Sequence, residues 1–118
     1  MKTSEILNLT EEEKEKINDE FCDACLDGDL QKAKEILKGY CKVDYGDNRA
    51  IRWASMRGHI EIVKLLLEHE KVNPTDRDNE AISWANSYNH KEIVRLLLQD
   101  ERVRNSLSKK GFEILSKV

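Results

Sequence analysis

The sequence lacks the features that mark membrane-spanning and secreted proteins. No apolar run approaches the roughly 18–20 residues that span a bilayer. The N-terminal MKTSEILNLTEEE has no apolar core of a secretory signal. One proline and five glycines argue against a disordered chain, and the three cysteines cannot all pair. We therefore expect a soluble, helix-rich, cytoplasmic protein whose thiols stay reduced.

The sequence is equally poor in patterns that carry chemistry. It has no nucleophile–base pair, no glycine-rich phosphate loop and no metal-ligand set at usable spacing, which predicts a non-enzyme without cofactor or metal. Cys22 and Cys25 have the C-x-x-C spacing of zinc sites but lack a second pair, so small buried thiols are favoured. A net charge of −3 argues against binding nucleic acid through its phosphates.

What the sequence does contain is a repeat. Residues 47–77 and 78–108 align without a gap as two 31-residue units with 15 identical positions. A degenerate third copy, FCDACLDGDLQKAKEILKG, begins at Phe21. A fixed period of this length indicates a solenoid, in which each unit buries its apolar face against its neighbours.

Each unit predicts two helices. Thr10 and Glu13 form a capping box that starts the first helix, which runs toward Leu26. The first helix of the next unit ends at Gly58, and its counterpart ends at Asn89, two residue types that tolerate the left-handed conformation. A second helix with an apolar band follows, at 60–69 in the middle unit. Residues 106–118 predict either a closing helix or the first helix of a truncated fourth unit.

The motif Gly58-His59-x-Glu61-Ile62-Val63-x-Leu65-Leu66-Leu67 resembles the ankyrin repeat, as does its copy from Asn89 to Leu98. The resemblance implies an all-α ankyrin-repeat solenoid of about three helix-turn-helix repeats with terminal caps. The Thr-Pro-Leu-His that usually opens the first helix is replaced by Arg-Ala-Ile-Arg and Glu-Ala-Ile-Ser, which leaves the cap geometry open. The A-I-x-W-A variant is similar to repeats of large DNA viruses and their hosts.

The expected organisation is a flexible N-terminus over residues 1–9 and a single domain over 10–118. That domain divides into a capping repeat (10–46), two full repeats (47–77 and 78–108) and a C-terminal cap (109–118). The resemblance implies that His59 and His90 support the turn between the two helices of a repeat. Trp53 and Trp84 are expected in the core, so that truncation of either would cost ~3–5 kcal/mol.

The candidates for binding a partner are mostly positions where the two units differ. They lie on the first helices and connector tips, where the family meets partners, and are Tyr45, Arg49, Arg52, Met56, Arg57, Arg77, Asp78, Glu80, Ser83, Ser87 and Tyr88. The opposing interpretation is that surface residues vary freely. Arg49, Arg52 and Arg57 indicate a partner protein with an acidic or mixed surface. Charge reversal at Arg52 and Arg57 together should weaken binding and barely change the melting temperature.

The predicted function is non-catalytic binding of another protein by a monomer, through the concave face and connector tips, without nucleic acid or membrane. Two alternatives remain open. One is a small stoichiometric inhibitor of a host enzyme or defence factor, of possible viral origin. The other is a structural protein that associates with itself through an exposed end such as 112–115.

Overall fold

The computed structural model describes residues 8–117, and within that range every regular element is a helix. The predicted flexible N-terminus lies outside the described residues apart from Asn8 and Leu9. The helices are α2 (Glu11–Asp27), α3 (Leu30–Leu37), α4 (Tyr45–Arg57), α5 (Ile60–Leu67), α6 (Asp76–Ser87), α7 (Lys91–Leu98), α8 (Glu101–Ser106) and α9 (Lys109–Ser116).

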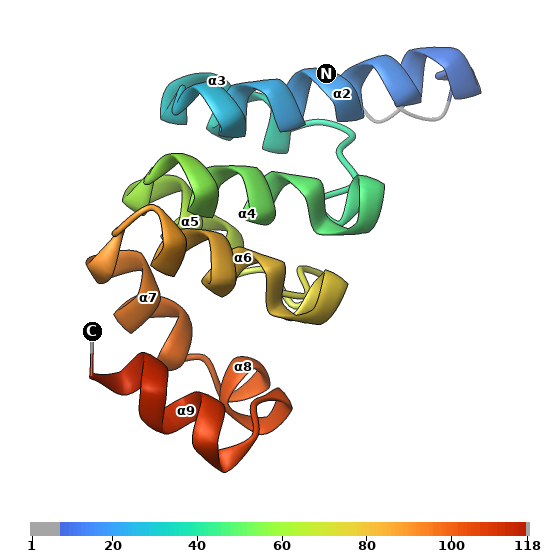
Figure 1. Ribbon diagram of the computed structural model, residues 1–118. Coiled ribbons are helices and arrows are strands. Elements are labelled where there is room, and N and C mark those ends of the chain that lie inside the picture. Colours follow the sequence, from blue (N-terminus) through green and yellow to red (C-terminus); the bar gives the residue numbers. More distant parts are fainter. Residues whose placement is uncertain (1–7, 118) are drawn as a thin grey trace.

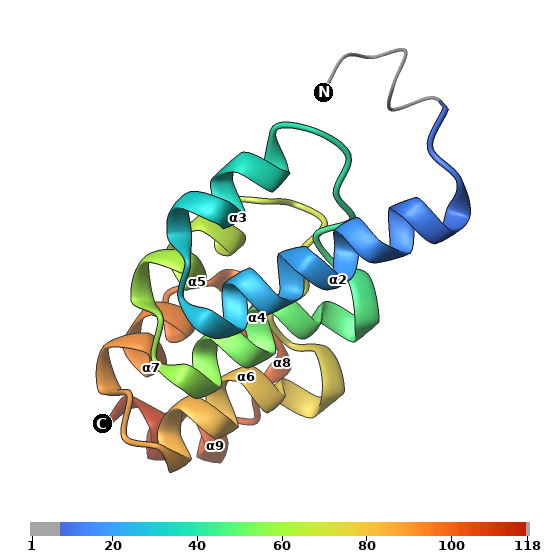
Figure 2. The same cartoon turned by 90° about the horizontal axis from the view of Figure 1, so that it is seen from above.

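The helices form a two-layered stack, as Figures 1 and 2 show. The first helices of the repeats, α2, α4 and α6, pack side by side in one layer, and the second helices, α3, α5 and α7, pack in the other. The molecule is elongated, with extents of 49 × 23 × 19 Å. The predicted all-α solenoid of three helix pairs is thus confirmed.

The ends of the helices follow the local sequence signals. Glu13 N–H donates to the Thr10 hydroxyl (3.1 Å) and Thr10 N–H donates to the Glu13 carboxylate (3.2 Å), which completes the predicted capping box. Gly28, Gly58 and Asn89 all have positive φ and separate the two helices of their repeats. The boundaries predicted from these residues are therefore confirmed.

Most of the apolar positions that are identical between the repeats form the core. They lie on the facing sides of the helices and exclude water almost completely. They are Ala50, Ile51 and Ala54 with Ala81, Ile82 and Ala85 in the first helices, and Ile62, Val63 and Leu66 with Ile93, Val94 and Leu97 in the second. Each repeat thus buries its apolar face only by stacking on the next.

The tryptophans, which were expected in the core, lie at its margin. Trp53 packs against the core but is only half-buried, with the Arg49 guanidinium 5.2 Å from its ring centre. Trp84, at the same position of the next repeat, is also half-buried. Both rings lie at the margin of the core, beside the fully buried Ala54 and Ala85, and a ring of this size rarely loses all its exposure. Truncation should therefore cost less than predicted.

A left-handed turn opens each of the two full repeats. Gly46, Asp47 and Asn48 all have φ between 57° and 65°, and Arg77, Asp78 and Asn79 have φ between 54° and 62°. Among residues with a side chain, Asp and Asn tolerate this region best. The identity of the Asp-Asn pair in both copies therefore has a backbone cause.

Asparagines hydrogen-bond the first helix of a repeat to the connector that leads to the next repeat. Asn18 Oδ1 accepts from the backbone N–H of Lys42 (2.8 Å), and Asn48 Oδ1 accepts from that of Asn73 (2.7 Å). Asn48 also donates to the carboxylate of Asp76 (3.0 Å). Asn18 and Asn48 are both buried, so these bonds are shielded from competing water.

The repeated histidines link the repeats in the opposite direction. His59 Nε2 lies 2.8 Å from the carbonyl oxygen of Leu26, and His90 Nε2 lies 3.0 Å from that of Met56. A carbonyl can only accept, so each ring donates. A Cβ added to Gly28 or Gly58 would come within 2.6–2.7 Å of the following histidine ring. The predicted structural role of the histidines is confirmed, and it extends across the repeat boundary.

The C-terminal residues form a closing helix. Ser108 caps α9 by accepting from Gly111 N–H (3.0 Å). α9 packs mainly against α7, whereas the first helix of a further repeat would stack on α6 as α6 does on α4. Leu107 and Leu115 contact the core, but Phe112 and Ile114 remain 36% and 58% exposed.

Candidate partner-binding site

The predicted partner-binding residues separate into two groups at opposite ends of the first helices. One end carries the left-handed turns, and we call it the connector end. The other carries the turn into the second helix, and we call it the helix end. Eight residues of helix rise about 12 Å, so one small partner element would not cover both ends easily.

Arg52 is not available to a partner, which corrects the prediction. Its side chain is buried, with the residue only 5% exposed. It donates to the carbonyl oxygens of Gly46 and Asp47 (both 3.0 Å) and pairs with the Glu80 carboxylate at 2.9 Å. The left-handed turn directs those two carbonyls at the guanidinium. Arg52 and Glu80 therefore join successive repeats, and charge reversal at Arg52 would unfold the stack.

Arg49 and Tyr45 at the connector end are also occupied. The Arg49 guanidinium lies 3.7 Å from the Asp19 carboxylate and 5.6 Å from the centre of the Tyr45 ring. The Tyr45 hydroxyl donates to Glu15 at 3.4 Å. Desolvation, together with the carboxylates of Asp19 and Glu15, raises the pKa of Tyr45. Both side chains are half-buried and lie against the preceding repeat.

The outermost connector residues form a weak pair. Arg77 lies 3.3 Å from the Asp47 carboxylate, and both side chains are more than half exposed. Solvent screens such a pair, so it contributes little stability. Asp78 is exposed beside it. Among the predicted partner-binding residues of the connector end, Arg77 and Asp78 are the ones that present charged groups freely to solvent.

The helix end has a different character. Met56, Arg57, Tyr88 and His90 line a pocket of about 370 Å³, which we call the helix-end pocket. Tyr88 is 59% exposed, Arg57 is exposed and Met56 is half-buried. Of the remaining predicted residues, Ser87 is exposed directly before Tyr88, and Ser83 is exposed one turn earlier on α6 without lining the pocket.

The pocket has a fixed floor. The His90 ring is held by its hydrogen bond to the Met56 carbonyl and by its close approach to Gly58. The Tyr88 ring stacks with it at a centroid separation of 6.4 Å and an interplanar angle of 22°. His90 was interpreted only as a structural residue, yet its ring contributes a wall of a pocket where interface-type residues gather.

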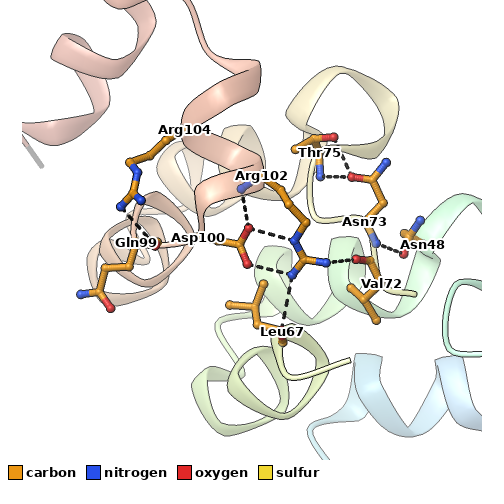
Figure 3. A network of polar contacts seen from close by, with 9 residues as sticks. All are labelled: Asn48, Leu67, Val72, Asn73, Thr75, Gln99, Asp100, Arg102 and Arg104. Carbon is orange, nitrogen blue, oxygen red and sulfur yellow. Dashed lines mark hydrogen bonds and ion pairs between the residues drawn. The ribbon is translucent and has the colours of Figure 1, made fainter. Parts of the chain in front are cut away.

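Polar contacts at the last connector were not predicted, and Figure 3 shows them. Arg102 pairs with Asp100 through two bonds of 2.8 and 3.0 Å and donates to the carbonyl oxygens of Leu67 and Val72. The hydrogen bond from Arg102 lowers the pKa of Asp100. Position 71, one repeat earlier, carries lysine, so no recurring residue indicated this link.

The cysteines have no reactive character. Burial raises the pKa of Cys22 to about 11 and that of Cys41 to about 12, and it raises the pKa of Cys25 still more strongly. The thiolate is the form that attacks electrophiles and binds zinc, and here it is strongly disfavoured. Across residues 8–117, no cluster of three or more His, Cys, Asp or Glu side chains could hold a metal ion. None of the helices described is long and apolar enough to cross a bilayer.

Comparison with known proteins identifies the repeats. A family profile described as ankyrin repeats (3 copies) matches residues 21–107, which is most of the chain. The matched region includes the degenerate first copy, both full copies and α8. Among solved structures, no significant match to the chain was found.

Proposed function

Because the chain belongs to the ankyrin-repeat family, whose repeats generally mediate protein–protein interactions, we propose that it binds a partner protein through the helix end. The surface comprises Met56, Arg57, Ser87 and Tyr88. The family is typically non-catalytic, and the proposed role is likewise binding alone. The observation that carries the proposal is the exposed Tyr88 ring beside Arg57 and Met56 around one pocket.

The residue types support this choice. Tyrosine, methionine and arginine are enriched in protein interfaces, where aromatic and arginine side chains supply most of the binding energy. Tyr88 stacks with His90 yet remains 59% exposed, so its ring is accessible to a partner. The connector end offers less, because Arg52, Arg49 and Glu80 are already paired within the stack.

The test is affinity capture from cells with wild-type protein, Tyr88→Ala and Phe112→Ala, followed by mass spectrometry and titration of the captured partner. Tyr88→Ala should weaken binding at least about tenfold, as expected for a central aromatic residue. Its melting temperature should stay unchanged, because the side chain is exposed. Phe112→Ala removes another exposed ring, on α9, and serves as the matched control. Equal binding by wild type and Tyr88→Ala would refute the proposal.

A second candidate function is self-association through α9. Phe112 and Ile114 are the exposed apolar residues there, and Ile114 is 58% exposed. Light scattering across a concentration series decides between the two. A molecular mass that stays at that of one chain at high concentration excludes self-association. A molecular mass that rises with concentration for wild type, but not for Ile114→Lys, would support it.

A further inference from the structure

One structural position carries a different residue in each of the three repeats. Asp27, Arg57 and Tyr88 each precede the left-handed residue that ends a first helix, namely Gly28, Gly58 and Asn89. Stacking places the three side chains in a row along the helix end. The helix-end pocket lies between the second and third members of that row, so it combines a cation with an aromatic ring.

Arg57 differs from the other arginines among the predicted partner residues. Arg49, Arg52 and Arg77 each have a carboxylate within 3.7 Å. Within residues 8–117, no carboxylate lies within 4 Å of the Arg57 guanidinium, although Asp27 occupies the adjacent position of the row. Among the residues that the structure describes, the Arg57 guanidinium is therefore a cation at the pocket rim without a counter-ion.

The pocket itself suits one side chain. Its volume of about 370 Å³ is near the lower limit of ligand pockets, which span ~300–1,000 Å³. Met56 and the Tyr88 ring offer apolar walls, and Arg57 offers a planar fork that matches a carboxylate in geometry and charge. A second, smaller pocket of about 200 Å³ continues beyond His90 and is lined in part by Lys91 and Glu92.

We infer that the helix-end pocket takes an apolar side chain of a partner's peptide segment, while an aspartate or glutamate close by in that segment pairs with Arg57. This inference rests on the proposed function and specifies the chemistry of the partner. The apolar side chain contacts Met56 and the face of Tyr88. Asp27 repels a carboxylate over the first repeat, so the acidic residue lies on the Tyr88 side of Arg57.

An array of synthetic peptides tests the inference directly. Each peptide has the form Gly-Ser-X-Gly-Z-Gly-Ser, where X is Ala, Leu, Phe or Trp and Z is Glu, Gln or Lys. A parallel set reverses X and Z. Labelled wild-type protein should retain peptides with large apolar X and Glu at Z, with about a tenfold preference for Glu over Gln.

Charge reversal provides the decisive comparison. Arg57→Glu should shift the preference at Z from Glu to Lys and keep the preference at X, whereas Tyr88→Ala should lose the preference at X. Arg95→Glu is the matched control, because Arg95 is an exposed arginine of α7 in the other layer. It should bind like wild type.

The outcomes separate the two proposals. Two outcomes overturn the inference and leave the proposed function standing. In one, peptide retention depends on Tyr88 but shows no preference for Glu at Z. In the other, Arg57→Glu leaves the preference for Glu at Z intact. If wild type retains no peptide above the Tyr88→Ala background, the inference also fails. Failure of the proposed function shows separately, as unchanged capture of the cellular partner by Tyr88→Ala.

Discussion

The two ends of the first helices contain residues of similar type in very different situations. At the connector end, Arg52 is buried and bonded to two carbonyls and to Glu80. At the helix end, Arg57 is exposed and borders a pocket beside Tyr88. Both arginines occupy positions where the two copies of the repeat disagree.

Disagreement between copies therefore has two causes. At the connector end, the difference between the copies reflects pairing between repeats. Arg52 pairs with the Glu80 carboxylate of α6, the next first helix in the stack. Its counterpart Ser83 lies on α6, on which no further first helix stacks. At the helix end, Arg57 has no carboxylate partner among residues 8–117, and Tyr88 stacks with His90 but remains 59% exposed. Only the second kind of difference points toward another molecule.

The largest expected effect is at Arg52. Arg52→Met keeps most of the packing but leaves Glu80 and two carbonyls without their donor, which should lower the free energy of unfolding by about 2–3 kcal/mol. Arg57→Met should change it by less than about 0.5 kcal/mol. Urea denaturation of both variants measures the difference. Similar losses in the free energy of unfolding for the two variants would contradict the difference between the connector end and the helix end.

A smaller effect is expected from the asparagines. Asn48→Gly keeps the left-handed backbone and removes both side-chain hydrogen bonds to the next connector, at a cost of about 1–2 kcal/mol. Asn79→Gly, the same change one repeat later, loses only contacts with the exposed Ser106 and should cost about 0.5 kcal/mol or less. Thermal denaturation compares them, and a larger loss at Asn79 would contradict the role of Asn48 in holding the connector that follows it.

The smallest expected effect is at Arg77, and it tests whether the connector end contributes to stability. Arg77 has φ 56°, where its counterpart in the preceding repeat is Gly46. Arg77→Gly should raise stability by about 0.5 kcal/mol, because relief of the strained conformation exceeds the lost surface ion pair and the added chain entropy. Peptide binding at the helix end should be unchanged. A loss of more than about 1 kcal/mol would show that the Arg77–Asp47 pair has been underestimated.

Much of the fold could be predicted because the repeat exposes it. Most apolar positions that are identical between the copies are ones that every repeat must bury, so Ala54 and Ile62 marked the core, whereas Gly58 marked a helix end by its residue type. Burial of Arg52 could not be predicted in this way. Its partners are carbonyls that reach it only after three consecutive residues adopt left-handed angles, and helical spacing gives no sign of that turn.

The candidate site was predicted less well for the same reason. A list of variable positions does not distinguish side chains that pair across repeats from those that face solvent. Met56, Arg57 and Tyr88 were on the list, and the structure brings them together. His90 was missed as a pocket residue because its recurrence indicated a structural role, which it also has. Arg102 was missed because it pairs through a connector that does not recur.

The histidine above Gly58 has a consequence for building longer arrays from these repeats. Position 58 must lack a Cβ because the ring of the next repeat occupies that space. Asn89 holds the same position in the last full repeat, where α9 rather than a histidine-bearing repeat follows. Grafting another such repeat after it would therefore require Asn89→Gly. The residue at this one position thus determines whether a histidine-bearing repeat can stack on the repeat that contains it.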